Sequence, residues 1–337
     1  MNDKFAKSSS NKSSMLSEKK NTDAVTSINY TSKLGEMLDS FARVMSAAID
    51  ARTPYNLNHT KNMVAYGKNF LDWLEKTESE FAFSEEKRRA FIMGIWLHDV
   101  GKIAIPSEIM DKESRLKDNG KAVFERFGII KLLERIAMLE GRIDEFEYKT
   151  RIENIERASV IIEIADKAEF LSDEILEEID GISKYTYVDD ENNICPWLSE
   201  YETECLSVRR GTLTAKERSI MESHVIMTSK LLTEMNFFDE YAIVPVLAAK
   251  HHELLNGKGY PNGILGDMIP WEVRLLTILD IFDALTAKDR PYKSPISIES
   301  AFDILWTMVK SDELDGDILK LFEESCAWED DLLYNNH

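Results

Sequence analysis

The residues of this sequence best suited to chemistry are its histidines, because imidazole binds metals and exchanges protons near neutral pH. The 337-residue chain contains six of them. The last, His337, ends the chain, and the other five lie on or at the ends of apolar helical patterns. These five are His59, His98, His224, His251 and His252. One histidine on an apolar face is more often a core residue than a ligand, but five in such settings favour a shared chemical role.

Two aspartates occur in similarly apolar surroundings. Asp99 follows the segment "FIMGIWLH" directly, and Asp280 lies inside "VRLLTILDIF". A buried carboxylate is costly unless it is neutralised, hydrogen-bonded or bound to a metal. Asp283 lies three residues after Asp280 and therefore on nearly the same helix face. A buried salt bridge is the alternative explanation for Asp280.

Imidazole and carboxylate groups without thiolate form a ligand set for iron, manganese, zinc or other first-row metals. Five histidines and two aspartates exceed the needs of one tetrahedral zinc ion, so we expect at least two ions. Two neighbouring metal ions are a recurrent arrangement for phosphoester hydrolysis. Lys102 lies four residues after His98 and would project from the same face if the helix continued. Its cation suits a phosphate oxygen, although an ordinary surface lysine fits equally well.

The double histidine opens the stretch "HHELLNGKGYP" at residues 251–261. On a regular helix adjacent side chains point about 100° apart, so the two imidazoles could reach different ions. The two glycines, Gly257 and Gly259, allow the backbone to approach a ligand closely. The remaining loop residues offer a charge, an aromatic face with a hydroxyl, and a fixed exit from the loop: Lys258, Tyr260 and Pro261. Without the histidines, the same residues would describe a plain turn.

The elements that position these side chains are predicted to be helices, because apolar residues recur every three or four positions. No segment shows a convincing strand period, so the predicted fold class is all-α. Ser84 begins one predicted helix, and Thr214 with Glu217 forms a capping box at the start of another, "KERSIMESHVIMTSKLLTEM". Further helices are expected before Pro54, around His59, in "AIVPVLAAKHH", in "WEVRLLTILDIFDALTA", and at about 297–310 with a short helix after it.

Residues 116–210 have a different character. Two long, highly charged helical patterns are predicted at about 120–140 and 143–169, and a third near 172–184. We expect the following stretch, "YTYVDDENNICPW", to be a loop. This region is predicted to be an inserted helical subdomain.

The bulk composition narrows the setting. The net charge of −20 argues against broad binding to duplex nucleic acid, which needs clustered Lys and Arg. The three cysteines form no CxxC pair, so a disulfide framework or a thiolate zinc site is not expected. Residues 1–26 are rich in Ser, Lys and Asn and are predicted to form a flexible tail. With no apolar signal core and no membrane-spanning run, a cytoplasmic protein without membrane contact is expected.

Taken together, these motifs resemble the HD-GYP family of metal-dependent phosphodiesterases, a branch of the HD phosphohydrolase superfamily. The matching stretches are "HDVGK" at 98–102, "HHELLNGKGYP" at 251–261 and "LDIFDALTAKDRPY" at 279–292, with "NLNHT" and "IMESH" in the right order. The resemblance covers about 28–115 and 211–310. It implies a discontinuous catalytic domain at 27–115 and 211–312, an insertion at 116–210 and a C-terminal tail at 313–337.

The resemblance implies a bundle of five to seven helices around a bi- or trinuclear centre, and hydrolysis of cyclic di-GMP to pGpG and/or GMP by a metal-activated hydroxide. It implies a role in bacterial signalling and two divalent ions, iron or manganese. The implied metal ligands are His59, His98, Asp99, His224, His251, His252 and Asp280. Asp99 and Lys102 are the implied catalytic residues, with Lys102 contacting phosphate. The implied substrate-binding residues are Lys102, Gly257, Lys258, Gly259, Tyr260, Pro261, Arg290 and Tyr292.

The sequence departs from the family pattern at three places. Trinuclear members carry a glutamate four residues before the first histidine; here Tyr55 stands there, which favours a binuclear centre. The loop usually reads DGxGYP, but Asn256 replaces the aspartate; asparagine can keep the turn without the carboxylate. The insertion separates His98 from His224, and we expect it to cover the site, pair two copies, or bind a signalling protein. Hydrolysis of another cyclic dinucleotide or nucleotide, and a catalytically weak cyclic-dinucleotide-binding module, remain alternatives.

Overall fold

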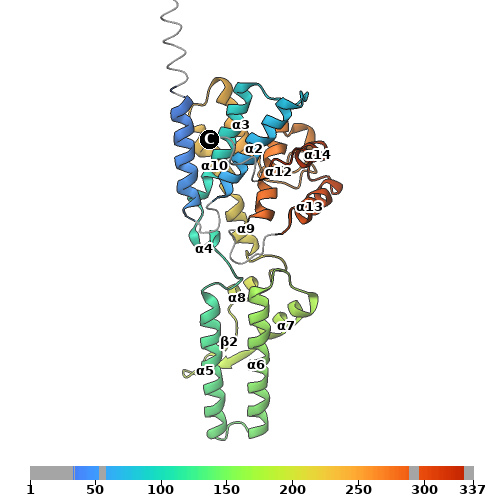
Figure 1. The fold of residues 1–337 in the computed structure, drawn as a ribbon. Coiled ribbons are helices and arrows are strands. Elements are labelled where there is room, and N and C mark those ends of the chain that lie inside the picture. The colour runs from blue at the N-terminus through green and yellow to red at the C-terminus, as the bar shows by residue number, and fades with distance from the viewer. Residues whose placement is uncertain (1–32, 34, 53–57, 288–295, 330–337) are drawn as a thin grey trace, which may run out of the picture. The chain divides into compact units, whose positions relative to one another are not determined.

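The protein folds as two helical units. The structure is a computed structural model that describes residues 33, 35–52, 58–287 and 296–329. Unit 1 comprises Met1–Ile103 and Val225–His337, and unit 2 comprises Ala104–His224. Helices dominate both units in the described residues (Figure 1), which confirms the all-α fold class. The domain boundaries predicted at 115/116 and 210/211 stay predictions.

Unit 1 contains the helices that carry most of the predicted ligands. Residues 35–50 are helical. The elements that follow are α2 (His59–Lys76), α3 (Glu85–Leu97), η1 (Val100–Ala104), α10 (His224–Thr233), η2 (Asp239–Ile243), α11 (Val244–Lys250), η3 (Gly266–Met268), α12 (Trp271–Thr286), α13 (Ile298–Lys310) and α14 (Gly316–Ser325). The predicted start of α3 is confirmed, because the Ser84 side chain accepts a hydrogen bond from the Lys87 backbone N–H.

The core of unit 1 holds α2, α3 and α12 in fixed relation to one another. Phe282 on α12 is fully buried and contacts Tyr66 of α2, Phe302 of α13 and Phe322 of α14. Burying aromatic side chains of this size is the main source of stability in such a core. The small residue Gly94 brings α3 against α11, because an added Cβ would lie 2.9 Å from a Leu247 methyl group. These contacts set the helix ends from which the histidines project.

Unit 2 is built around two long helices that lie side by side in Figure 1, α5 (Asn119–Leu139) and α6 (Glu145–Lys167). Their bounds match the predicted charged helices. The other elements are α4 (Ser107–Met110), α7 (Asp173–Ser183), β1 (Thr186–Val188), β2 (Ile194–Pro196), α8 (Glu200–Leu206) and α9 (Ala215–Glu222). The core of the unit includes Phe127 of α5, Ile155 and Ile162 of α6, and Ile179 of α7.

The expected loop at 185–197 was wrong in part, because it contains an antiparallel hairpin. Thr186 pairs with Pro196, and Val188 pairs with Ile194. Strands of three residues are too short to show a readable alternation. The Asp189 side chain closes the turn by accepting hydrogen bonds from two backbone N–H groups, those of residues 191 and 193.

The single helix predicted after Thr214 was also wrong, because it is two helices. The capping box is confirmed: Thr214 accepts from the Glu217 N–H, and the Glu217 carboxylate accepts from the Thr214 N–H. Helix α9 then ends at Glu222, and α10 begins at His224. The Ser223 hydroxyl donates to the carbonyl of Ile220, which offers the backbone a bond outside the regular helical ladder. No helix within the described ranges is both long and apolar enough to cross a membrane.

Candidate metal centre

The predicted ligands meet where several helices of the bundle begin or end. His59 is the first residue of α2, and His98 directly follows the last residue of α3. His251 follows α11, and Asp280 lies within α12. His224 is the last residue of unit 2 and the first of α10, whose other residues belong to unit 1. Helix termini suit this role because their side chains project beyond the packed cylinder.

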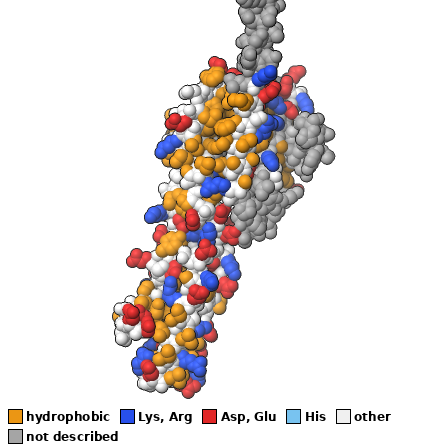
Figure 2. Space-filling view, turned by 90° about the vertical axis from the view of Figure 1, so that its left-hand side faces the viewer, with side chains coloured by type: hydrophobic (Ala, Val, Ile, Leu, Met, Phe, Trp, Pro, Cys, Tyr) orange, Lys and Arg blue, Asp and Glu red, His pale blue; other side chains and the backbone are white. Residues whose placement is uncertain are grey.

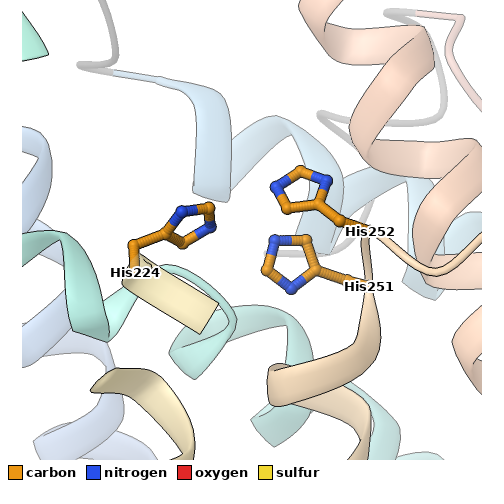
Figure 3. Close-up of side chains that lie close together, drawn as sticks. All are labelled: His224, His251 and His252. Atoms are coloured by element: carbon orange, nitrogen blue, oxygen red, sulfur yellow. The ribbon is translucent and has the colours of Figure 1, made fainter. Parts of the chain in front are cut away.

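Three groups of potential ligand atoms lie close together. In each group, the atoms are within 4.8 Å of one another. The groups are His59, His98 and Asp280; His98, Asp99 and His251; and His224, His251 and His252. Figure 3 shows the third group, with the His224 ring facing the adjacent rings of the double histidine. The structure therefore brings all seven predicted ligands together, and shared membership of His98 and His251 makes the groups one continuous cluster.

Backbone hydrogen bonds orient three of the imidazoles. The Nδ1 atom of His98 lies 2.7 Å from the carbonyl oxygen of Ile95, three residues earlier. The same arrangement places His224 Nδ1 2.8 Å from the carbonyl of residue 221, and His251 Nδ1 2.8 Å from that of residue 248. A carbonyl only accepts, so each Nδ1 must be the protonated donor. In the neutral ring, Nε2 then carries the lone pair that a metal requires.

The chemistry of this donor set fits divalent metal ions. The Nε2 atom of His98 is buried and makes no hydrogen bond to any group in the described ranges. It lies 3.2 Å from Asp99 Oδ2, a carboxylate oxygen that can also bind a metal ion. Burial and the neighbouring imidazoles lower the pKa of His251 well below its ordinary value, so this ring is neutral at physiological pH. Neutral imidazoles beside carboxylates are ligands for iron, manganese or zinc, and thiolate is absent among the grouped residues.

His59 is oriented differently, by a carboxylate from another helix. Its Nδ1 lies 2.6 Å from Asp283 Oδ2, and its Nε2 lies 3.3 Å from Asp280 Oδ1. The other oxygen of Asp283 accepts a hydrogen bond from Asn62 at 3.0 Å. Burial alone would lower the pKa of His59, but the two carboxylates outweigh it and raise that pKa to about 10. Asp283 thus orients the His59 ring through Nδ1, while Asp280 lies near the other ring nitrogen, Nε2.

The pKa values of Asp280 and Lys102 are also shifted by burial and by neighbouring ionisable side chains. Burial would raise the pKa of Asp280, but His59 and His252 outweigh it and hold the pKa far below its usual range. Burial would lower the pKa of Lys102, but the Asp99 carboxylate raises it. Lys102 Nζ lies 2.5 Å from Asp99 Oδ2. The condition that the helix continues from His98 to Lys102 is not met, because α3 ends at Leu97 and Lys102 lies on the 3₁₀ helix η1.

The glycine-rich loop lies directly beside the double histidine. The Tyr260 ring lies 4.7 Å from that of His252, centroid to centroid. Gly257 has a φ of +74°, a conformation that favours glycine. A Cβ at Gly259 would lie 2.3 to 2.6 Å from backbone atoms of residues 252–254, so only glycine fits there. Lys258 at the loop tip is exposed.

Asn256 keeps the turn in place of the family's aspartate. Its side-chain oxygen accepts a hydrogen bond from the Lys258 N–H at 3.0 Å, and its amide donates to the Ser311 carbonyl at 3.2 Å. Asparagine tolerates this role because it needs an acceptor but no charge. Pro261 follows Tyr260 in this loop. Tyr55, Arg290 and Tyr292 lie outside the described residues.

Sequence reasoning missed several buried residues that hold this cluster. Thr228 donates to the carbonyl of His98 and accepts from the Gly101 N–H. Thr277 donates to the carbonyl of His251 at 2.7 Å. Both threonines are buried, and each stands as a polar residue in an apolar helical stretch, which was the available signal. Glu253 accepts from two loop N–H groups, and Asp50 is buried near His59, where burial raises its pKa.

Comparison with known protein families bears on this cluster. Residues 202–318 match the HD domain family. This match places an HD domain in the second half of the chain. Over 100 residues it is 35% identical to the cyclic di-GMP phosphodiesterase response regulator RpfG of Xanthomonas campestris pv. campestris, covering 29% of this chain and 26% of that protein.

Two further relatives carry similar names. The chain is 38% identical over 95 residues to 3'3'-cGAMP-specific phosphodiesterase 3 of Vibrio cholerae, covering 28% of this chain and 20% of that protein. It is 34% identical over 95 residues to a cyclic di-GMP phosphodiesterase of Thermotoga maritima, covering 28% of this chain and 25% of that protein. The HD-GYP similarity thus spans about a quarter of the length of these relatives.

Proposed function

We propose that this HD-GYP-type chain is a metal-dependent phosphodiesterase that hydrolyses cyclic di-GMP to pGpG and/or GMP. The observation that carries the proposal is the continuous cluster of five imidazoles and two carboxylates at the helix ends. Three of its rings donate from Nδ1 to a backbone carbonyl, which in the neutral ring puts the lone pair on Nε2, as metal ligation requires. The names of the relatives, cyclic di-GMP and cGAMP phosphodiesterases, favour a cyclic dinucleotide substrate.

The proposed centre holds two divalent ions, iron or manganese, on His59, His98, Asp99, His224, His251, His252 and Asp280. When bound, such ions would activate water and stabilise charge on the phosphate. The protein's own residues orient these ligands, and Lys102 supplies a cation held in place by Asp99. Lys102 is then positioned for a phosphate oxygen once the substrate competes for it.

The proposed substrate contacts come from the loop beside His252. The tilted Tyr260 ring lies against His252 and offers a face for a base. Gly257 and Gly259 allow the backbone to come close to phosphate, while Lys258 and Pro261 complete the loop. Arg290 and Tyr292 are proposed on the family resemblance alone. We also propose a cytoplasmic setting, for which the free thiols of Cys195, Cys205 and Cys326 are the support.

The decisive test is turnover by purified protein reconstituted anaerobically with Fe(II) or Mn(II), with products separated by chromatography. Formation of pGpG or GMP is expected, with loss of turnover in His98→Ala/Asp99→Ala. Asp303→Ala, on helix α13, is the matched control and should retain activity. Turnover in the double variant would contradict the proposal.

A second candidate substrate is 3'3'-cGAMP, which the names of the Vibrio cholerae relatives favour. A competition assay with equal concentrations of both dinucleotides separates the two by initial rate. A protein that binds metal and a cyclic dinucleotide but never hydrolyses it would instead be a binding module.

A further inference from the structure

Helix α5 of unit 2 is apolar on two opposite sides. One side packs into the core of the unit through Val123, Phe127 and Ile130, which are buried. The opposite side exposes a second set of apolar side chains: Phe124 at 40%, Ile129 at 54%, Leu132 at 61%, Ile136 at 45% and Leu139 at 72%. At about 100° per residue, these five lie within an arc of about 140° centred opposite the buried side. A surface helix ordinarily carries charged or polar residues there.

This second stripe is long enough to form a helix–helix contact. From Phe124 to Leu139 it extends about 22 Å, at about 1.5 Å per residue. Gly128 lies within the stripe, and an added Cβ there would meet nothing within 4 Å. A small residue at this position leaves room for a large side chain of a partner helix. Figure 2 views the side that carries α5 and shows hydrophobic side chains exposed among charged ones on unit 2.

The charges along the stripe identify the partner. Glu125 lies towards its N-terminal end, and Arg135 towards its C-terminal end. When two copies of α5 pair antiparallel about residue 130, Glu125 of each copy faces Arg135 of the other, because both lie five residues from the centre. Two-fold symmetry forms this opposite-charge pair twice. A parallel pairing would place every charge against its own copy.

Three of the five exposed apolar residues fit the same register. Phe124 of one copy faces Ile136 of the other, and Leu132 faces the small residue Gly128. Knobs of this kind filling holes on a facing helix are the normal packing of paired helices. Within its own helix, Glu125 meets only the highly exposed Lys121, at 3.6 Å, so this pair offers little resistance to rearrangement.

We propose that the exposed α5 stripe is a dimer interface, in which two copies of this chain pair their α5 helices antiparallel about residue 130. The proposal concerns unit 2 and does not depend on the proposed phosphodiesterase activity. Association is measured as a molar mass, so its failure is distinguishable from a failure of catalysis.

The experiment is sedimentation equilibrium of the full chain over a concentration series from nanomolar to high micromolar, with circular dichroism to verify folding. The wild type should dimerise, and Leu132→Lys should be monomeric throughout, because it places two lysines near the symmetry axis. The matched control is Val160→Lys on α6, where Val160 is 57% exposed but lies off the stripe. It should dimerise like the wild type.

A charge exchange tests the antiparallel register. Glu125→Arg and Arg135→Glu alone each create two like-charge pairs and should weaken dimerisation by about tenfold. The double variant restores opposite charges and should return to within about threefold of the wild type. A monomeric wild type, a dimer that survives Leu132→Lys, or equal loss in Val160→Lys overturns the proposal. A double variant no better than the singles overturns the register.

Discussion

The loop beside the double histidine depends on one buried carboxylate, and Glu253→Gln tests that dependence. Glu253 is 2% exposed, and its two oxygens accept the N–H groups of Asn262 at 2.8 Å and Ile264 at 3.0 Å. Glutamine has the same shape but only one acceptor oxygen. Whichever way the amide turns, its NH₂ group faces a backbone N–H, so one of the two bonds is lost.

The size of the effect follows from the kind of bond. A hydrogen bond to a charged group contributes about 1.5–3 kcal/mol. Since about 1.4 kcal/mol corresponds to a tenfold change in an equilibrium constant, local opening of the loop should become about 10- to 150-fold more frequent. The global fold should persist, because the buried aromatic cluster around Phe282 is untouched.

Hydrogen exchange with mass spectrometry measures this opening directly. Peptides that contain residues 262–264 should exchange about 10- to 150-fold faster in Glu253→Gln, while peptides of α5 and α6 remain unchanged. Asp267→Asn is the matched control, because Asp267 is an exposed carboxylate on the nearby η3. Exchange within twofold of the wild type in Glu253→Gln, or equal acceleration in the control, would refute the reasoning.

Further predictions concern the rest of the chain. Gly259→Ala should destabilise unit 1 by about 2–4 kcal/mol in chemical denaturation, because its Cβ meets backbone atoms at 2.3 Å. Asp283→Asn should weaken Mn(II) binding by calorimetry about 10- to 100-fold, because it loosens the orientation of His59; unchanged affinity would contradict this. Lys112→Met should cost unit 2 about 3–5 kcal/mol in denaturation, because it leaves the Glu217 charge buried without its cation. Burial raises the pKa of Glu217, but the hydrogen bonds that it accepts from Lys112, Thr214 and Tyr201 together outweigh burial and lower the pKa. The resulting stability exists above the unfolded pKa and is lost as pH falls through the folded pKa. Melting curves of Glu217→Gln should therefore show a weaker acid dependence below about pH 4.5.

Much of the helical framework was predictable from local signals. The capping residues Ser84 and Thr214 marked helix starts correctly, because an N-cap depends on residues within one turn of the chain. The break at Ser223 was not predictable, because the apolar spacing continues across it and a serine is tolerated within a helix. The hairpin at 185–197 was not predictable either, because its strands are shorter than the alternating pattern needed to recognise a strand.

The cluster itself was predictable by residue type, because histidines and aspartates are conspicuous in apolar segments. The groups that hold it were harder to find. Asp283 was visible as a neighbour of Asp280 on one helix face, but its contact is His59, which lies 224 residues earlier in the chain. Thr228 and Thr277 act through backbone carbonyls of other helices, and no local pattern encodes such tertiary pairing.

The oriented histidines differ in where their hydrogen-bond acceptors lie in the chain, and this difference decides how each ring responds to movement of its helix. His98, His224 and His251 each use a carbonyl three residues earlier, so any of these helix ends can shift as a body and carry a correctly turned ring with it. His59 is instead oriented by the carboxylate of Asp283, which lies on a different helix, α12. If mutation or heat loosens the packing of α2 against α12, the His59 ring should therefore lose its orientation first, while the rings of the other three histidines keep theirs.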